Sequence, residues 1–204
     1  MAMKAPTVAA LAALATAAPC SAQVIAEFRA GADWSSVLVT DVIVEEFTVQ
    51  PAIAPSLGLA VGTPLGPKYE VALDVRWARS DLKTKQADSS RTIIPLTVWS
   101  GFVVLRWRLQ QRWLVQAGVG AVKYDPSEDG RESTMFRDDQ PLRATVGLAI
   151  RGEYPVSRSL RVGIDLGWSA HGFTTQALRE EGFDTRIAHR VSLAAVLRWS
   201  NEKQ

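Results

Sequence analysis

From residue 24 onward, apolar and polar side chains alternate with a period of two, and helical periodicity is nearly absent. This alternation predicts β-strands, because successive side chains of a strand point to opposite faces of the sheet. We expect an all-β fold with eight strands, at residues 24–36, 46–63, 68–80, 92–109, 112–124, 141–154, 159–173 and 186–200.

The predicted connections alternate between short and long. The short ones are residues 64–67, 110–111 and 155–158, and the longer, mostly polar ones are 37–45, 81–91, 125–140 and 174–185. Short turns at one end and long loops at the other are typical of an up-and-down outer-membrane barrel. The segment 37–44 is apolar for an exposed loop, so we expect it to extend the first two strands beyond the membrane.

Charge is confined to one face of the five strands with the cleanest pattern. In the seventh strand one face reads Leu160, Val162, Ile164, Leu166 and Trp168, and the opposite face reads Arg161, Gly163, Asp165 and Gly167. A soluble, lipocalin-like barrel would turn the charged face to water, whereas a membrane barrel turns it into the lumen.

Three features favour the membrane alternative. Away from strand ends, the charges on these polar faces are Arg, Asp or Glu rather than Lys, and small residues are frequent there, as a crowded lumen requires. Aromatic side chains gather near strand ends, where they would form interfacial girdles: Trp34, Trp77, Trp107, Trp113, Tyr154 and Trp199. The fourth strand has no firm register, because Val103 and Val104 are adjacent, which suggests a bulge.

Taken together, the pattern and the loop lengths resemble the small outer-membrane barrels of the OmpA and OmpX type. The resemblance covers the whole mature chain and implies an eight-stranded antiparallel barrel that contacts membrane lipid, lipopolysaccharide and the outer-membrane insertion machinery. One departure concerns the C-terminus. Such barrels commonly end in an aromatic residue, whereas here Trp199 is followed by five further residues.

The N-terminal segment predicts a secretory signal peptide at residues 1–22. Lys4 precedes an uncharged, mostly apolar stretch, and small residues at Cys20 and Ala22 fit cleavage after Ala22. Cleavage would leave a barrel domain of residues 23–204 without thiols, as suits an oxidising compartment. Lipidation of Cys20 is the alternative, and Pro19 just before it disfavours that. We therefore expect a Gram-negative outer-membrane location, with both termini in the periplasm.

Charge and hydropathy argue against two other classes, nucleic-acid-binding proteins and helical membrane proteins. The formal net charge of +2 gives no reason to expect a nucleic-acid partner. The longest uncharged run after the expected signal peptide, residues 47–67, contains four prolines, which would break a transmembrane helix repeatedly.

The polar faces predict a charged lumen. An eight-stranded barrel is just wide enough to be filled by side chains, so opposite charges should pair inside it. The structural interpretation is a salt-bridge plug, and the alternative is a path for ions or small solutes. The residues expected to point inward are Glu27, Arg29, Asp33, Glu70, Asp74, Arg76, Arg106, Arg143, Arg151, Glu153, Arg161, Asp165, Arg190 and Arg198.

Catalysis is the third alternative, as a lipid-modifying barrel enzyme. The histidines are His171, expected to face the lumen beside Ser169, and His189, expected to face lipid. The His-x-Ser motif of barrel lipid A deacylases is absent, so we expect neither an enzyme nor a cofactor.

Two loops carry charge that could bind ions or lipid. The acids of the 125–140 loop do not match the spacing of a calcium loop, so no metal is expected. The basic residues Lys83, Lys85 and Arg91 of the 81–91 loop could touch lipopolysaccharide phosphates.

Overall fold

The computed structural model describes residues 23–42, 46–86, 89–127, 135–136 and 142–201, so the expected signal peptide lies outside the described residues. The strands are β1 (Ile25–Ser35), β2 (Val39–Val42), β3 (Glu46–Pro51), β4 (Ala54–Pro64), β5 (Tyr69–Gln86), β6 (Ser89–Gln110), β7 (Trp113–Pro126), β8 (Leu142–Pro155), β9 (Leu160–Phe173) and β10 (Arg186–Ser200). A five-residue helix, α3 (Gln176–Glu180), lies between β9 and β10. In the described part of the chain, no helix is long and apolar enough to cross a membrane.

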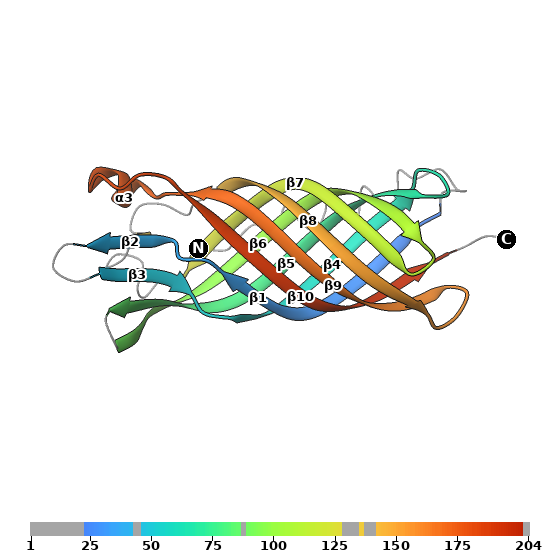
Figure 1. Ribbon diagram of the computed structural model, residues 1–204, viewed down its shortest axis with the longest axis horizontal. Coiled ribbons are helices and arrows are strands. Elements are labelled where there is room, and N and C mark those ends of the chain that lie inside the picture. The colour runs from blue at the N-terminus through green and yellow to red at the C-terminus, as the bar shows by residue number, and fades with distance from the viewer. Residues whose placement is uncertain (1–22, 43–45, 87–88, 128–134, 137–141, 202–204) are drawn as a thin grey trace, which may run out of the picture.

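The strands form a closed antiparallel barrel (Figure 1). Closure comes from β1, which pairs with β4 on one side and β10 on the other, so that Phe28 lies between Leu59 and Leu197. β3 and β4 both pair with β5 and share one position in the ring, separated by an interruption at residues 52–53 next to Pro51. The ring therefore has eight positions, as predicted, and β2 adds to β3 at one end.

The two ends of the barrel differ. One end, here called the turn end, holds the connections at residues 65–68, 111–112 and 156–159, the start of β1 and the end of β10. There the backbone N–H of Val24 donates to the Asn201 side chain at 2.6 Å. The opposite end, the loop end, holds β2, β3 and α3 (Figure 1).

The prediction of a loop at residues 81–91 was wrong. β5 and β6 continue through most of that segment to Gln86 and Ser89, with one register shift between Leu82 and Lys83. The strands persist because the alternation persists: Leu82 is fully buried inside the barrel while Lys83 and Lys85 turn outward. The apolar segment 37–44 likewise contributes β2, which pairs with β3 beyond the main ring.

The central part of β6 pairs with β5 and β7 in a single, uninterrupted register. Val103 points outward and Val104 inward, and both are paired regularly with β5 and β7, so the suspected bulge is not at this position. The irregularities lie elsewhere, opposite Leu82/Lys83 and at Arg108/Gln110 near the turn end.

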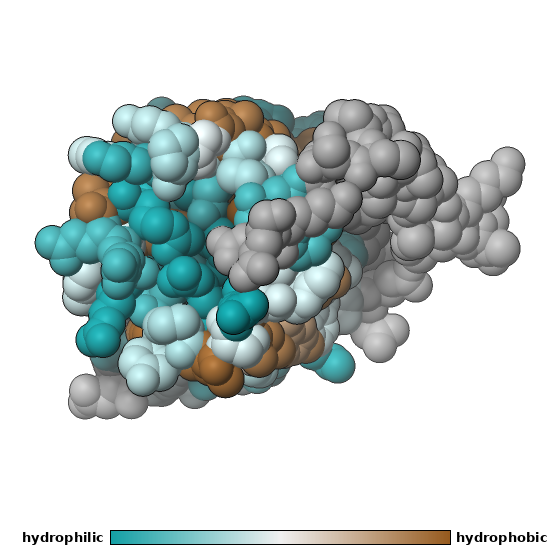
Figure 2. Space-filling model, turned by 90° about the vertical axis from the view of Figure 1, so that its right-hand side faces the viewer, coloured by the Kyte–Doolittle hydropathy of each residue, from teal (hydrophilic) through white to brown (hydrophobic). Residues whose placement is uncertain are grey.

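The barrel is apolar outside and polar inside over most of its length. Leu59, Val119 and Ile164 expose 63–64% of their surface, whereas Asp74, Arg106 and Arg151 are fully buried. Viewed from the turn end, hydrophilic residues fill the centre and hydrophobic ones lie on the flanks (Figure 2). A soluble barrel would show the opposite arrangement, because water-facing surfaces avoid contiguous apolar area.

Candidate functional site: the barrel lumen

Glu27 is the centre of the charged lumen. Its carboxylate accepts hydrogen bonds from three guanidinium groups, those of Arg29 at 3.0 Å, Arg106 at 2.8 and 2.9 Å and Arg151 at 2.8 Å. The side chains of all four residues are at most 3% exposed. β1, β6 and β8 thus converge on one carboxylate.

Asp74 and Asp165 extend these contacts towards the middle of the barrel. Arg29 donates to Asp74 at 2.7 Å, and Arg76 also reaches Asp74, at 3.0 Å. Arg151 donates two bonds to Asp165, at 2.9 and 3.0 Å. Each of these two aspartates therefore has at least one close arginine.

Glu70 and Glu153 extend the contacts towards the turn end. Arg198 donates two bonds to Glu70, at 2.6 and 2.9 Å. Arg108 bridges the two acids, at 3.0 Å to Glu70 and 3.2 Å to Glu153. Sequence reasoning missed Arg108, although it has the same strand parity as Arg106.

We call these side chains together the ion-pair network. Five carboxylates and six guanidiniums from β1, β5, β6, β8, β9 and β10 form it: Glu27, Glu70, Asp74, Glu153, Asp165, Arg29, Arg76, Arg106, Arg108, Arg151 and Arg198. Every carboxylate in it has an arginine partner, as buried charges require.

Inward glycines make room for the long arginine side chains. A Cβ added at Gly167 would come within 2.5 Å of the Ser192 hydroxyl and 3.4 Å of the Arg76 guanidinium. A Cβ at Gly58 would meet the Arg76 side chain at 3.3 Å and that of Arg29 at 3.6 Å. These two glycines of the polar faces therefore serve packing inside the lumen.

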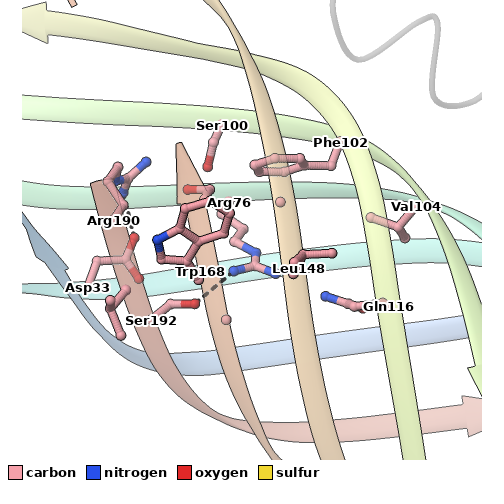
Figure 3. A pocket seen from close by; sticks show the side chains of 14 residues that line it. Asp33, Arg76, Ser100, Phe102, Val104, Gln116, Leu148, Trp168, Arg190 and Ser192 are labelled. Atoms are coloured by element: carbon pink, nitrogen blue, oxygen red, sulfur yellow. Dashed lines mark hydrogen bonds and ion pairs between the residues drawn. The ribbon is translucent and has the colours of Figure 1, made fainter. Parts of the chain in front are cut away.

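Above the network, towards the loop end, the lumen holds a small cavity of about 30 Å³ with polar and apolar side chains in its lining (Figure 3). Arg76 donates to Ser192 at 3.0 Å, and Arg190 donates to Asp33 at 2.6 Å. Ser100 and Gln116 also line the cavity. One water needs roughly 10–15 Å³ of such space, so the cavity has room for about two waters and not for a hydrated ion.

The loop end of the lumen is filled by apolar side chains, which we call the loop-end cluster. Its members are Leu38, Val39, Val49, Leu82, Ile94, Leu96, Val98, Val122, Tyr124, Phe136, Phe173, Leu178 and Ala188. Phe136 is fully buried and contacts the rings of Tyr124 and Phe173, with centroids 6.5 and 6.1 Å away. The sequence hinted at this cluster only through the apolar segment 37–44.

Four of the residues expected to point inward lie apart from the network. Arg143 donates to the backbone carbonyl of Thr174, and Arg161 donates to that of Gln111 at 3.2 Å. Both are partly exposed. Arg190 and Asp33 form the separate pair beside the cavity.

The two histidines occupy opposite faces of the wall. His171 is buried, and its Nε2 lies 2.8 Å from the hydroxyl of Tyr124. His189 is exposed on the outer face and stacks on Trp168, with ring centroids 5.8 Å apart.

Most of the acids in the 125–140 loop, Glu128, Asp129, Glu132, Asp138 and Asp139, lie outside the described residues. Within the described ranges, no three His, Cys, Asp or Glu side chains gather in a way that could hold a metal ion.

The aromatic residues singled out from the sequence lie on the outer face. Trp34, Trp107, Trp113, Tyr154 and Trp199 expose about half of their surface, and Trp77 is half-buried beside its cross-strand partner Trp99. They fall into two belts. Tyr69, Trp107, Trp113, Tyr154 and Trp199 lie near the turn end, and Trp34, Trp77, Trp99 and Trp168 lie nearer the loop end.

Comparison with solved structures assigns the fold. The outer-membrane protein OprG from Pseudomonas aeruginosa matches 89% of this chain and 97% of its own with a TM-score of 0.59 at 10% identity. The outer-membrane protein AlkL, solved in DMPC lipid bilayers, matches 100% of this chain and 98% of its own with a TM-score of 0.61 at 13% identity. No protein-family model and no curated protein sequence matches the chain.

The chain thus has the fold of small bacterial outer-membrane β-barrels, and the predicted fold class is confirmed. Its lumen is polar and filled by side chains along the length of the ion-pair network.

Proposed function

We propose that this chain is an integral outer-membrane barrel whose lumen is closed by the ion-pair network and whose loop end stands at the cell surface. The outward apolar surface between the two aromatic belts supports the membrane placement. In β6 the belts are marked by Trp99 and Trp107, eight residues apart. At about 3.4 Å per residue this is roughly 27 Å along the strand, or roughly 20 Å of height at the usual barrel tilt, close to the ~25 Å apolar band of such barrels.

The observation that carries the closed lumen is the convergence of Arg29, Arg106 and Arg151 on Glu27. These groups are almost fully buried and multiply bonded, and breaking a buried pair costs about 3–5 kcal/mol. Thermal fluctuation alone therefore rarely opens such a network. The cavity above it has room for about two waters. A second space of about 10 Å³, beside Tyr124 of the loop-end cluster, has room for about one.

A structural or surface-interaction role follows from a closed lumen, rather than catalysis. The buried histidine, His171, has its Nε2 engaged by Tyr124. The loop end would present Lys83, Lys85 and Arg91 near lipopolysaccharide phosphates. The turn end would face the periplasm, where the signal peptide is removed after Ala22 before the insertion machinery receives the chain.

The test is a conductance measurement on the refolded mature chain in planar lipid bilayers. We expect insertion without steady single-channel steps. Reproducible conductance of the size seen for a water-filled pore would overturn the closed lumen and favour the channel alternative. Failure to insert into lipid, with a soluble monomer instead, would overturn the membrane placement.

A further inference from the structure

A groove marks the outer face of the barrel near the turn end, from β7 across β8 and β9 to β10. Its volume is about 960 Å³, and its walls are almost entirely apolar. Small-molecule sites commonly occupy roughly 300–1,000 Å³. The side chains around it include Trp113, Ile150, Tyr154, Val162, Ile164 and Leu193.

The groove exists because the outer face of β8 lacks one side chain. Leu148, Ile150 and Tyr154 point outward along this strand, but the intervening outward position is Gly152. Gly152 pairs with Trp113 on one side and Ile164 on the other. A Cβ built at Gly152 would meet only the Trp113 ring, at 3.6 and 3.8 Å, so the missing side chain leaves open space against that ring.

The end of the groove nearest the turn end carries positive charge. Arg112 is exposed, lines the groove, and holds its guanidinium 5.7 Å from the centre of the Tyr154 ring. Among the ion pairs of the described residues, none includes Arg112, so its charge is directed to solvent or to a ligand.

We propose that this groove binds one anionic phospholipid of the inner leaflet. An acyl chain would lie over Gly152 between Trp113 and Tyr154, and Arg112 would hold the phosphate. The groove is apolar along its length and ends at the Arg112 cation, at the level of the aromatic belt near the turn end. A phospholipid has the same order, an apolar acyl chain followed by an anionic headgroup. This site rests on the proposed function, because it requires the turn end to lie at the periplasmic surface of the membrane.

Tryptophan quenching by lipids brominated on their acyl chains tests the site. Two single-tryptophan variants keep either Trp113, in the groove, or Trp107, in the same belt but outside it, with the other six tryptophans changed to Phe. Each is refolded into phosphatidylcholine vesicles containing equal mole fractions of brominated phosphatidylglycerol or brominated phosphatidylcholine. Folding is checked by heat-modifiable gel mobility.

We expect phosphatidylglycerol to be preferred about fivefold at Trp113, the order of magnitude of one basic residue at an anionic surface, and not preferred at Trp107. Arg112→Gln should remove the preference. Lys68→Gln, which removes an exposed cation of the same end away from the groove, should leave it unchanged. Gly152→Leu should fill the groove and reduce quenching of Trp113 by phosphatidylglycerol to the level seen with phosphatidylcholine.

Native mass spectrometry of the unaltered barrel is a second measurement in case the tryptophan variants fold poorly. One phosphatidylglycerol should stay bound, and Arg112→Gln should lose it. Equal quenching of Trp113 by both lipids would overturn this site while leaving the membrane placement intact. Absence of quenching at Trp107 as well would overturn the placement itself. If neither brominated lipid quenched Trp113 while both quenched Trp107, and cross-linking gave dimers, the groove would be covered by a second copy of the chain. That result would overturn the lipid site.

Discussion

The two halves of the lumen are built from the same strands but have opposite chemistry. In β5 the inward residues between the belts are charged, as at Asp74 and Arg76, whereas further along the same face Leu82 enters the loop-end cluster. The outward face changes in the opposite sense, from Leu73 and Val75 to Lys83 and Lys85. The strand parity does not change.

This difference between the two halves indicates where the surroundings of the barrel change from membrane hydrocarbon to water. Between the belts the outer face is apolar and the charges are inside, as in a barrel surrounded by hydrocarbon. Beyond Trp77 and Trp99 the polar side chains are outside and the apolar ones inside, as in a soluble barrel. One continuous sheet thus passes from one solvent to the other, and two different cores close the lumen. The variants below test each core.

The largest effect is expected at the centre of the ion-pair network. Glu27→Ala leaves Arg106 and Arg151 without their shared carboxylate and should lower the free energy of unfolding by about 3–5 kcal/mol. Urea unfolding of the barrel in lipid vesicles measures this loss. Asp165→Ala is the matched control, because Arg151 then keeps Glu27 and Glu153, and it should cost less than Glu27→Ala. Unchanged stability with altered ion selectivity in either variant would mean that the lumen is hydrated.

The described side chains of the loop-end cluster form no ion pairs, so the contribution of the cluster to stability should depend on the volume of its buried side chains. Phe136→Ala removes a fully buried ring from the contact with Tyr124 and Phe173, and large core truncations of this kind cost about 3–5 kcal/mol. Because the cluster lies beyond the belts, we expect the loss mainly as faster hydrogen exchange in β2, β3 and the loop-end part of β6. Uniformly faster exchange along the whole barrel would contradict two separate cores.

Arginine substitutions on the outer face test where the barrel passes from hydrocarbon to water. Leu148→Arg places a charge midway along the apolar face of β8 and should cost roughly 2–4 kcal/mol in lipid. Thr97→Arg, on the outer face of β6 beyond Trp99, should cost at most about 1 kcal/mol, as near an interface. Equal losses of unfolding free energy for Leu148→Arg and Thr97→Arg would contradict a boundary between hydrocarbon and water at Trp77 and Trp99.

Among the changes inside the lumen, the smallest effect is expected where the two cores meet. Asp33 binds Arg190 beside the cavity of about 30 Å³, in which water can replace a lost hydrogen bond. Asp33→Asn should therefore lower the free energy of unfolding by only about 1 kcal/mol, as measured by urea unfolding. A loss as large as that of Glu27→Ala would mean that this layer is as dry as the ion-pair network.

Local sequence pattern determined which side chains share a face and where most strands begin and end. Alternation with a period of two depends only on neighbouring residues, which is why the sequence alone assigns Leu148 and Ile164 to the apolar face. The same parity assigned Glu27, Arg106 and Arg151 to the opposite face.

Tertiary structure decided which of these residues meet and what surrounds them. Glu27 contacts Arg106 and Arg151 from 79 and 124 positions away, because ring closure and strand stagger set the level of each side chain in the barrel. The stagger also brought Arg108 into the network and carried β5 and β6 through the expected loop. Alternation gives the face of a residue but not its height along the barrel, and height separates the charged core from the apolar one.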